Sequence, residues 1–221
     1  MSSNPGSRRH VTRRALPAAA DPSAVAGACR APLPASIAPQ IATPVEAVPE
    51  GAAWFYELEL HGHRLIARID GGRARLSSAG HWTHRLPTLA AALEALPIGS
   101  ALLDGAAVVL DARGRTRTEA LQEKLDRGDD EGVELFLFDL LYLNGYDLRE
   151  AGLGDRKRLL RWLVASAPRH SPLHLNDHLC GSGCSFLNEA CRAGMQGVIC
   201  KRADAPYRPG RTHTWLEVKC R

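Results

Sequence analysis

The chain has 221 residues, of which 45% are hydrophobic, so it can bury one sizeable domain but not two large ones. Its formal net charge of +4 at pH 7 is too mild to indicate nucleic-acid binding by itself. No apolar run approaches the ~20 residues that a membrane-crossing helix needs, and no signal-peptide core is visible. Only four of the 28 basic residues are lysines. The arginine excess could serve bidentate phosphate contacts, although an Arg-rich coding habit is the favoured interpretation.

The cysteines suggest a reducing compartment. The chain holds six of them, in no paired framework, at positions 29, 180, 184, 191, 200 and 220. We therefore expect reduced thiols in a cytoplasmic protein. His178, Cys180 and Cys184 offer a possible zinc site, but their spacing differs from that of common zinc knuckles. Incidental thiols are favoured there, and no metal site is predicted.

Residues 1–37 are rich in Ala, Pro, Ser and Arg and poor in large apolar side chains. Such a segment buries too little surface to offset its ordering entropy, so we expect a disordered tail. Its arginines could imitate a transit peptide or contact DNA phosphates, but a plain linker is the favoured interpretation. The folded domain is expected to span residues 38–221.

The first half of this domain reads as strands with two helices. Residues 56–60 and 64–70 alternate like half-buried strands, and Gly71-Gly72 predicts a tight hairpin between residues 70 and 76. Residues 86–96 have helical spacing and end at Pro97. Residues 100–111 then predict a second hairpin, turning at Asp104-Gly105, and residues 116–125 a polar helix.

The second half continues the same mixture. Residues 133–143 form an apolar run typical of a strand buried on both faces, and residues 155–165 an amphipathic helix with Asp155 as its N-cap. A short segment at 173–179, a helix at 185–194 and strands at 196–202 and 214–220 follow. Many hairpins with interspersed helices indicate an α+β fold with antiparallel sheets.

Five stretches carry a resemblance to a known family. They are, in order, "YELELHGHR" (56–64), "LLDGAAVVLD" (102–111), "LFDLLYLNG" (137–145), "QGVICKRADAPYRPG" (196–210) and "WLEVKCR" (215–221). They resemble the successive nucleotidyltransferase motifs of ATP-dependent DNA ligases, above all the ligase module of bacterial ligase D. Five motifs in the correct order make the resemblance strong, and it covers about residues 38–221.

The resemblance implies a ligase-type adenylation domain, with two antiparallel sheets flanked by helices. In this family a lysine within a K-x-D-G pattern attacks the α-phosphate of ATP, assisted by Mg or Mn. The adenylate then passes to a DNA 5′-phosphate during DNA repair and recombination. An OB-fold domain normally follows the last motif, and we expect none, because the chain ends at Arg221. DNA ends, or a repair partner such as the end-binding Ku protein, are the implied partners.

The catalytic positions depart from the family pattern. The nucleophilic lysine is replaced by Glu59, and the aspartate of the same motif by His61. The metal-associated glutamate is Ala106, the glutamate before "GVICKR" is Gln196, and the first lysine of the last motif is Glu217. Glu59 replaces a cation by an anion beside the triphosphate, so we expect no ligation.

Other nucleotide-binding positions match the family. By resemblance Glu57 helps to hold the adenine, Arg64 lies on the ribose side, and Phe138 stacks on the base. Lys201 and Lys219 are possible phosphate contacts. Core packing is an equally good interpretation of Phe138, and Lys201 could be a solvated charge.

The sequence thus predicts a catalytically inactive ligase-like protein, a pseudoenzyme. A non-catalytic module that binds DNA or a repair partner, and a decaying gene product, remain as alternatives. Period-2 alternation puts Glu217 and Lys219 on one strand face and Leu216, Val218 and Cys220 on the other. An unpaired buried carboxylate is costly, so we expect Arg64, Lys201 or Lys219 to approach Glu59 or Glu217.

Overall fold

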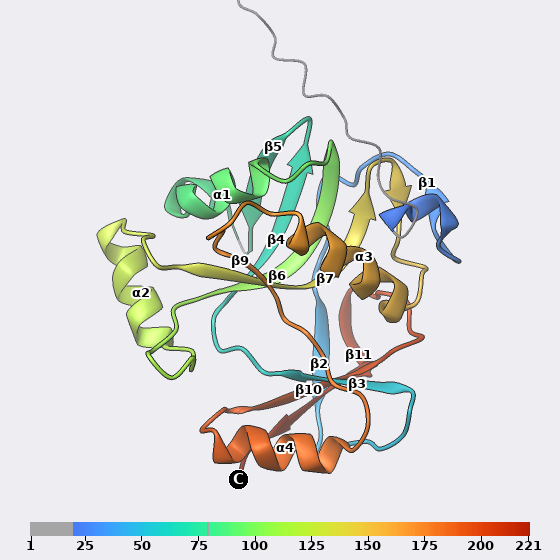
Figure 1. The fold of residues 1–221 in the computed structure, drawn as a ribbon, viewed down its shortest axis with the longest axis vertical. Helices are drawn as coiled ribbons and strands as arrows, with labels where there is room; N and C mark the ends of the chain where they lie inside the picture. Colours follow the sequence, from blue (N-terminus) through green and yellow to red (C-terminus); the bar gives the residue numbers. More distant parts are fainter. Residues whose placement is uncertain (1–19, 79) are drawn as a thin grey trace, which may run out of the picture.

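Two β-sheets face each other in the computed structural model, which describes residues 20–78 and 80–221 (Figure 1). Within these residues the larger sheet has seven strands in the order β1-β8-β7-β6-β4-β5, with β9 paired to β7. Its strands are β1 (Cys29–Arg30), β4 (His63–Asp70), β5 (Arg73–Ser77), β6 (Ser100–Val108), β7 (Glu134–Leu143), β8 (Tyr146–Asp147) and β9 (Leu173–Leu175).

The smaller sheet has four strands in the order β2-β11-β10-β3. They are β2 (Gln40–Pro44), β3 (Trp54–Leu58), β10 (Gly197–Arg202) and β11 (Gly210–Lys219). The pairings in both sheets are antiparallel except for β7 with β9 and β11 with β2. The predicted α+β class, with two largely antiparallel sheets and flanking helices, is confirmed.

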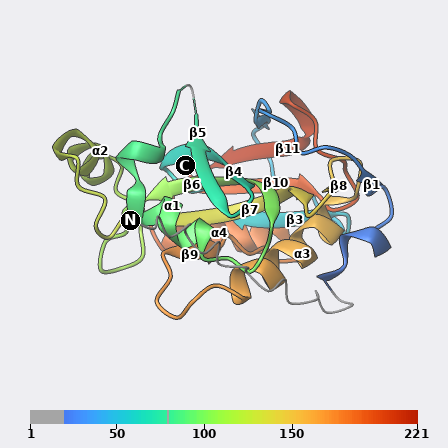
Figure 2. The same ribbon diagram turned by 90° about the horizontal axis from the view of Figure 1, so that it is seen from above.

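Helices cover the outer faces of the two sheets, as the two views show (Figures 1 and 2). On the larger sheet, α3 (Leu153–Ala165) packs on β7 and α1 (Pro87–Glu94) packs on β5. On the smaller sheet, α4 (Gly183–Arg192) packs on β10 and β3. The described residues also form α2 (Thr118–Arg127) and the 3₁₀ turns η2 (Pro22–Ala24) and η3 (Thr83–Arg85). None of the helices in the described ranges has the length and apolar content needed to cross a bilayer.

The apolar side chains form three clusters that follow this layering. One lies between the larger sheet and its helices and includes Leu103, Leu137 and Leu160. A second, which includes Phe138 and Trp215, joins side chains from the two sheets. A third lies between the smaller sheet and α4. A cleft between the two sheets is therefore bordered on each side by the strands of one sheet.

Local sequence signals account for some turns and fail at others. Gly71 and Gly72 both have positive φ, 58° and 78°, and close the predicted hairpin between β4 and β5. The predicted N-cap of the helix at 155–165 is wrong. Gly152 is the N-cap of α3, and Asp155 lies within the first turn, where it bonds Arg158.

The predicted hairpin at Asp104-Gly105 is also wrong. Both residues lie inside the continuous strand β6, between β4 and β7. Asp104 is fully buried, and its carboxylate accepts hydrogen bonds from Arg64 and from the hydroxyl of Tyr207. Gly105 allows a close approach of β7, because a Cβ there would lie 2.7 Å from the carbonyl oxygen of Phe136. An Asp-Gly pair usually marks a turn. Here Asp104 supplies the carboxylate of a buried ion pair, and Gly105 lets the neighbouring strand approach closely.

The expectation of disorder up to residue 37 is corrected for residues 20–37. Ala20 and Val25 are buried in the cluster on the larger sheet. β1 pairs with β8 at the sheet edge, and the carbonyl oxygen of Ala31 accepts a hydrogen bond from the Tyr142 hydroxyl at 2.9 Å. The segment is poor in apolar residues of its own, but it gains backbone partners and a ready-made apolar surface from the sheet. Residues 1–19 lie outside the described residues.

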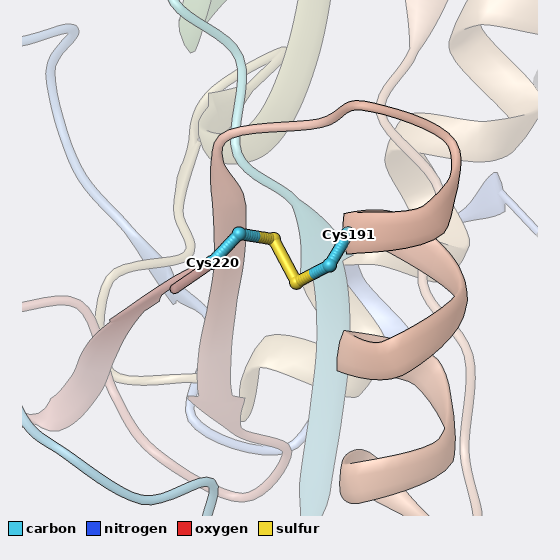
Figure 3. The surroundings of a disulfide bond; sticks show 2 residues. All are labelled: Cys191 and Cys220. Carbon is cyan, nitrogen blue, oxygen red and sulfur yellow. A yellow bond between two sulfur atoms is a disulfide. The ribbon is translucent and has the colours of Figure 1, made fainter.

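A disulfide joins Cys191, at the end of α4, to Cys220, directly after β11 (Figure 3). The expectation of reduced, unpaired cysteines is therefore wrong for these two. Sequence spacing gave no indication of the pair, because the two residues meet only when α4 packs on the smaller sheet. The other cysteines are free. Cys29, Cys180 and Cys184 are exposed, and Cys200 is buried.

Alkylation should reveal this arrangement in steps. We expect iodoacetamide to label Cys29, Cys180 and Cys184 in the native protein, and Cys200 in addition only after unfolding without reductant. Burial raises the pKa of Cys200 to about 12, which withholds the reactive thiolate. Cys191 and Cys220 should react only after reduction. Intact-mass spectrometry counts the labels, and labelling of either disulfide cysteine under native, non-reducing conditions would contradict the structure.

Candidate functional site

One face of the smaller sheet carries the chemistry-bearing side chains. Strand pairing puts Glu57, Ile199 and Glu217 in one row across β3, β10 and β11, and Lys201 beside Trp215 in the next. All of these residues line a single cleft. Their even-numbered neighbours, such as Val198 and Val218, point to the opposite face and pack toward α4. The predicted alternation of Glu217 and Lys219 against Leu216 and Val218 is confirmed.

A third row brings Glu59, Gly197 and Lys219 together. The backbone N–H of Glu59 bonds the carbonyl oxygen of Gly197, whose register partner is Lys219. A Cβ on Gly197 would lie 2.7 Å from Oε2 of Glu59, so the glycine makes room for the carboxylate. Glu59 and Lys219 therefore meet across the intervening strand. This contact confirms the expectation that a cation approaches Glu59.

Glu217 and His61 complete this group, which we call the anionic cluster (Glu59, His61, Glu217 and Lys219). Lys219 Nζ lies 2.7 Å from Oε1 of Glu217, and Nε2 of His61 lies 2.9 Å from Oε1 of Glu59. Partial burial lowers the pKa of Lys219, but hydrogen bonds to Glu217 and Glu59 outweigh it and raise the pKa above its usual value. Burial likewise raises the pKa of Glu217, but its contacts with Lys219 and Glu59 and the positive charge of Lys219 together outweigh burial and lower the pKa. Both ions stay charged at neutral pH.

The larger sheet supplies the opposite wall. Arg64 on β4 and Ala106 on β6 are register partners, and both line the cleft together with Phe138 of β7. The cleft has a volume of about 290 Å³. Phe138 and Trp215 meet edge-to-face with ring centroids 6.0 Å apart. Phe138 packs in the cluster between the sheets and also borders the cleft, and its stacking on a base stays a prediction.

Two buried lysines bind Glu57 at the floor of the cleft. Lys157 Nζ donates to Oε1 at 2.6 Å, and Lys201 Nζ donates to Oε2 at 2.8 Å. Asn176 Nδ2 adds a longer bond to Oε2 at 3.3 Å. Lys201 also lies 4.0 Å and 4.3 Å from the ring centroids of Trp215 and Phe138. Lys201 is thus a buried, paired cation rather than a solvated charge.

Burial governs the ionisation of Lys201. Desolvation lowers its pKa to about 8, against the opposing attraction of Glu57. An ammonium at this position is therefore held by a single carboxylate that it shares with Lys157. The Glu57 carboxylate has about four acceptor positions, and the three donors leave one for a ligand N–H.

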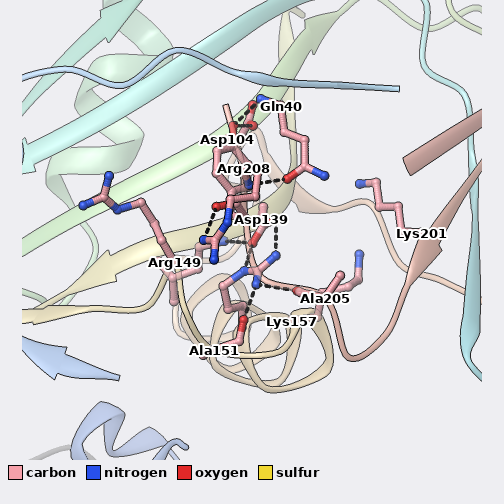
Figure 4. Close-up of polar contacts among 12 residues, drawn as sticks. Gln40, Asp104, Asp139, Arg149, Ala151, Lys157, Lys201, Ala205 and Arg208 are labelled. Carbon is pink, nitrogen blue, oxygen red and sulfur yellow. Dashed lines mark hydrogen bonds and ion pairs between the residues drawn. The ribbon is translucent and has the colours of Figure 1, made fainter. Parts of the chain in front are cut away.

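A second polar network fixes the wall that carries Arg64. Arg64 donates to both oxygens of Asp104, at 2.9 and 2.6 Å, and Tyr207 donates to Asp104 at 2.7 Å. Asp104 and Asp139 are register partners on β6 and β7 (Figure 4). Asp139 in turn accepts two hydrogen bonds from the fully buried Arg156 of α3. The cleft wall therefore rests on paired buried charges, which resist rearrangement only while each partner is present.

Most of the residues that the sequence singled out come together in the cleft. Its lining includes Glu57, Glu59, Arg64, Ala106, Phe138, Lys201 and Glu217. His61 and Lys219 adjoin it through Glu59. Gln196 is exposed just before β10 and is not part of the lining.

Sequence reasoning missed Lys157, Asn176 and Trp215. For Lys157 a signal existed, since Leu153, Lys157 and Leu160 follow the spacing of a buried helix stripe. No comparable local signal marks Asn176 or Trp215 as part of the cleft.

The two ends of the cleft differ in what they can hold. The end with Phe138, Trp215 and Glu57 combines aromatic side chains with one remaining acceptor position, which are groups that can recognise a nucleoside. At the other end, Glu59 and Glu217 would face the phosphates of ATP, and the nearby Lys219 is already bound to both. Among residues 20–78 and 80–221, no group of three or more His, Cys, Asp or Glu is placed to hold a metal ion. Lys219 already contacts the carboxylates of both Glu59 and Glu217, and Ala106 offers no oxygen ligand, so no step is derived through Mg or Mn.

The two-sheet fold and its cleft are those of a DNA ligase adenylation domain, a nucleotidyltransferase-type fold. The structure is similar to the crystal structure of the ligase domain from M. tuberculosis LigD, with a TM-score of 0.72 and 33% identity, covering 83% of this chain and 60% of that chain. It is equally similar to a mycobacterial DNA ligase D complexed with ATP and MES, with a TM-score of 0.71, 34% identity and the same coverage.

The sequence comparison agrees. Residues 32–219 match the ATP dependent DNA ligase domain, and the chain belongs to the ATP-dependent DNA ligase family. It is 41% identical over 193 residues to the multifunctional non-homologous end joining protein LigD of Pseudomonas aeruginosa, covering 86% of this chain and 23% of that protein. It is 33% identical over 235 residues to a probable DNA ligase of Beutenbergia cavernae, covering 98% of this chain and 45% of that protein. The chain thus spans less than half the length of either relative.

Proposed function

We propose that this chain is a ligase-type adenylation domain that binds a nucleoside in its cleft without forming a covalent adenylate. The observation that carries the proposal is the anionic cluster. By family resemblance the nucleophilic lysine belongs at position 59, and there a carboxylate binds Lys219 instead. The name of the P. aeruginosa relative, a non-homologous end joining protein, supports DNA ends as the setting of this function.

The chemistry explains why the cluster opposes adenylate transfer. Attack on the α-phosphate needs a neutral amine and surrounding cations that stabilise the developing negative charge. Two carboxylates at this end act in the opposite sense. One pair of unit charges ~4 Å apart contributes about 4 kcal/mol at an effective dielectric near 20, so replacing attraction by repulsion costs at most about twice that.

An adenylation assay tests the proposal. After incubation with α-labelled ATP and Mg or Mn, we expect no labelled protein on a denaturing gel, with the ligase domain of M. tuberculosis LigD as the positive control. An acid-labile, hydroxylamine-sensitive adenylate would identify Glu59 as an acyl-phosphate nucleophile and overturn the proposal. An acid-stable adenylate would do the same and would point to Lys201 or Lys219.

A further inference from the structure

The end of the cleft at Glu59 and Glu217 carries an excess of negative charge. Lys219 contacts both Glu59 and Glu217, so two carboxyl groups face one ammonium, and the formal charges of these three side chains sum to one negative. The Glu59 side chain is only 11% exposed and that of Glu217 24%, so solvent screens these carboxylates incompletely. Lys219 already donates to both of them, and Oε2 of Glu59 has no donor within the described part of the chain.

The other cations of the lining do not offset this excess. Arg64 is bound to Asp104 through two hydrogen bonds, and Lys201 is bound to Glu57. Arg211 lies on the far side of Trp215 along β11, where its guanidinium donates to the carbonyl oxygen of Ala42 at 2.6 Å. The charge is therefore distributed unevenly along the cleft. Cations lie beside the aromatic rings, and the Glu59 and Glu217 carboxylates lie at the opposite end.

Building on the proposed function, we propose that the cleft selects nucleosides with a neutral or cationic 5′ group over nucleoside 5′-phosphates. The base lies between Phe138 and Trp215 on one side and Glu57 on the other, and the 5′ group points to Glu59 and Glu217. A 5′-phosphate then meets two carboxylates, whereas a 5′-ammonium finds acceptors. The cleft volume of about 290 Å³ lies just below the ~300–1,000 Å³ typical of ligand pockets, which favours a nucleoside over the larger nucleoside triphosphate.

A ligand series that varies only the 5′ charge tests this selectivity. Isothermal titration calorimetry without divalent metal would compare 5′-amino-5′-deoxyadenosine, adenosine, AMP and ATP. We expect affinity to fall in that order. Adenosine should bind about tenfold more tightly than ATP, and the amino nucleoside a few-fold more tightly than adenosine, because the cluster is partly exposed and its field partly screened.

Charge variants connect the selectivity to the anionic cluster. Glu217→Lys should reverse the order, so that ATP binds more tightly than adenosine, and Glu217→Gln should fall between. Glu123→Lys is the matched control. It makes the same change in charge on α2, where Glu123 is 66% exposed and pairs only weakly with Arg127 at 3.5 Å. Circular dichroism melting curves for each variant show that the fold is kept.

The outcomes separate this inference from the proposed function. If the unmodified chain binds ATP more tightly than adenosine, the selectivity is overturned while binding without covalent transfer still stands. An order that Glu217→Lys and Glu217→Gln leave unchanged would also overturn it, since the cluster would not be its cause. Failure of all four ligands to bind at millimolar concentration would overturn both proposals, whereas a covalent adenylate would overturn the proposed function alone.

Discussion

Replacing Glu57 by glutamine is expected to lower the free energy of unfolding by about 3–5 kcal/mol, the range measured when one partner of a buried ion pair is removed. Glu57 is 1% exposed and binds the ammonium groups of Lys157 and Lys201, both of them buried. A glutamine keeps the shape but supplies no negative charge, so two lysines would lose their anionic partner in a low-dielectric site. The same change in charge at the surface has a much smaller effect.

Urea unfolding followed by circular dichroism gives this free energy. Glu123→Gln is the control, because its pair with Arg127 is exposed and should contribute under about 1 kcal/mol. The double variant Glu57→Gln with Lys157→Met should recover part of the loss, since it removes one of the two uncompensated cations. A loss below about 1 kcal/mol for Glu57→Gln, comparable with the control, would show that Glu57 does not hold the lysines.

Local periodicity allowed much of the cleft to be predicted. The side-chain period of a strand is 2, so Glu217 and Lys219 had to share a face whatever the tertiary structure. The cost of leaving a buried carboxylate unpaired predicted that Arg64, Lys201 or Lys219 would approach Glu59 or Glu217, and Lys219 contacts both. These inferences needed only short-range geometry and charge.

The failures share a physical cause, which is that the deciding partner is distant in sequence. Asp104 looked like a turn residue because its partners, Arg64 and Tyr207, are 40 and 103 residues away. Cys191 and Cys220 meet only through the packing of α4 on the smaller sheet. Lys157 was not singled out from the sequence, because its partner Glu57 is 100 residues away.

The same reasoning applies to the segment of residues 20–37. Composition measures what a segment can bury by itself, and this one has few large apolar residues. The edge of the larger sheet supplies backbone partners for β1, and the main core accepts Ala20 and Val25. Composition alone therefore predicts disorder incorrectly for a segment that adds a strand to the edge of an existing sheet.

A single Glu59→Lys substitution is expected to produce no detectable covalent adenylate. In the structure Glu59 adjoins Lys219, and Lys219 lies 2.7 Å from Glu217. A lysine at position 59 would stand beside the Glu217 carboxylate, which favours the protonated, non-nucleophilic ammonium. It would also lack a metal-associated carboxylate, since Ala106 occupies that position by family resemblance. Removing a nucleophile can cost about a millionfold in rate, and supplying one without its charged surroundings recovers little.

Restoring the surroundings together with the nucleophile should change this result. The five substitutions Glu59→Lys, His61→Asp, Ala106→Glu, Gln196→Glu and Glu217→Lys are expected to give measurable self-adenylation with ATP and Mg or Mn. Glu217→Lys removes the carboxylate that would hold the new lysine protonated, and the cation introduced at position 217 then faces the phosphates. The matched control carries the other four substitutions and keeps Glu59. Labelled protein on a denaturing gel is the readout, with acid stability reporting a phosphoramidate. Equal labelling of the control would show that position 59 does not carry the adenylate. Labelling of the single Glu59→Lys variant would show that a lysine there reacts even beside the Glu217 carboxylate.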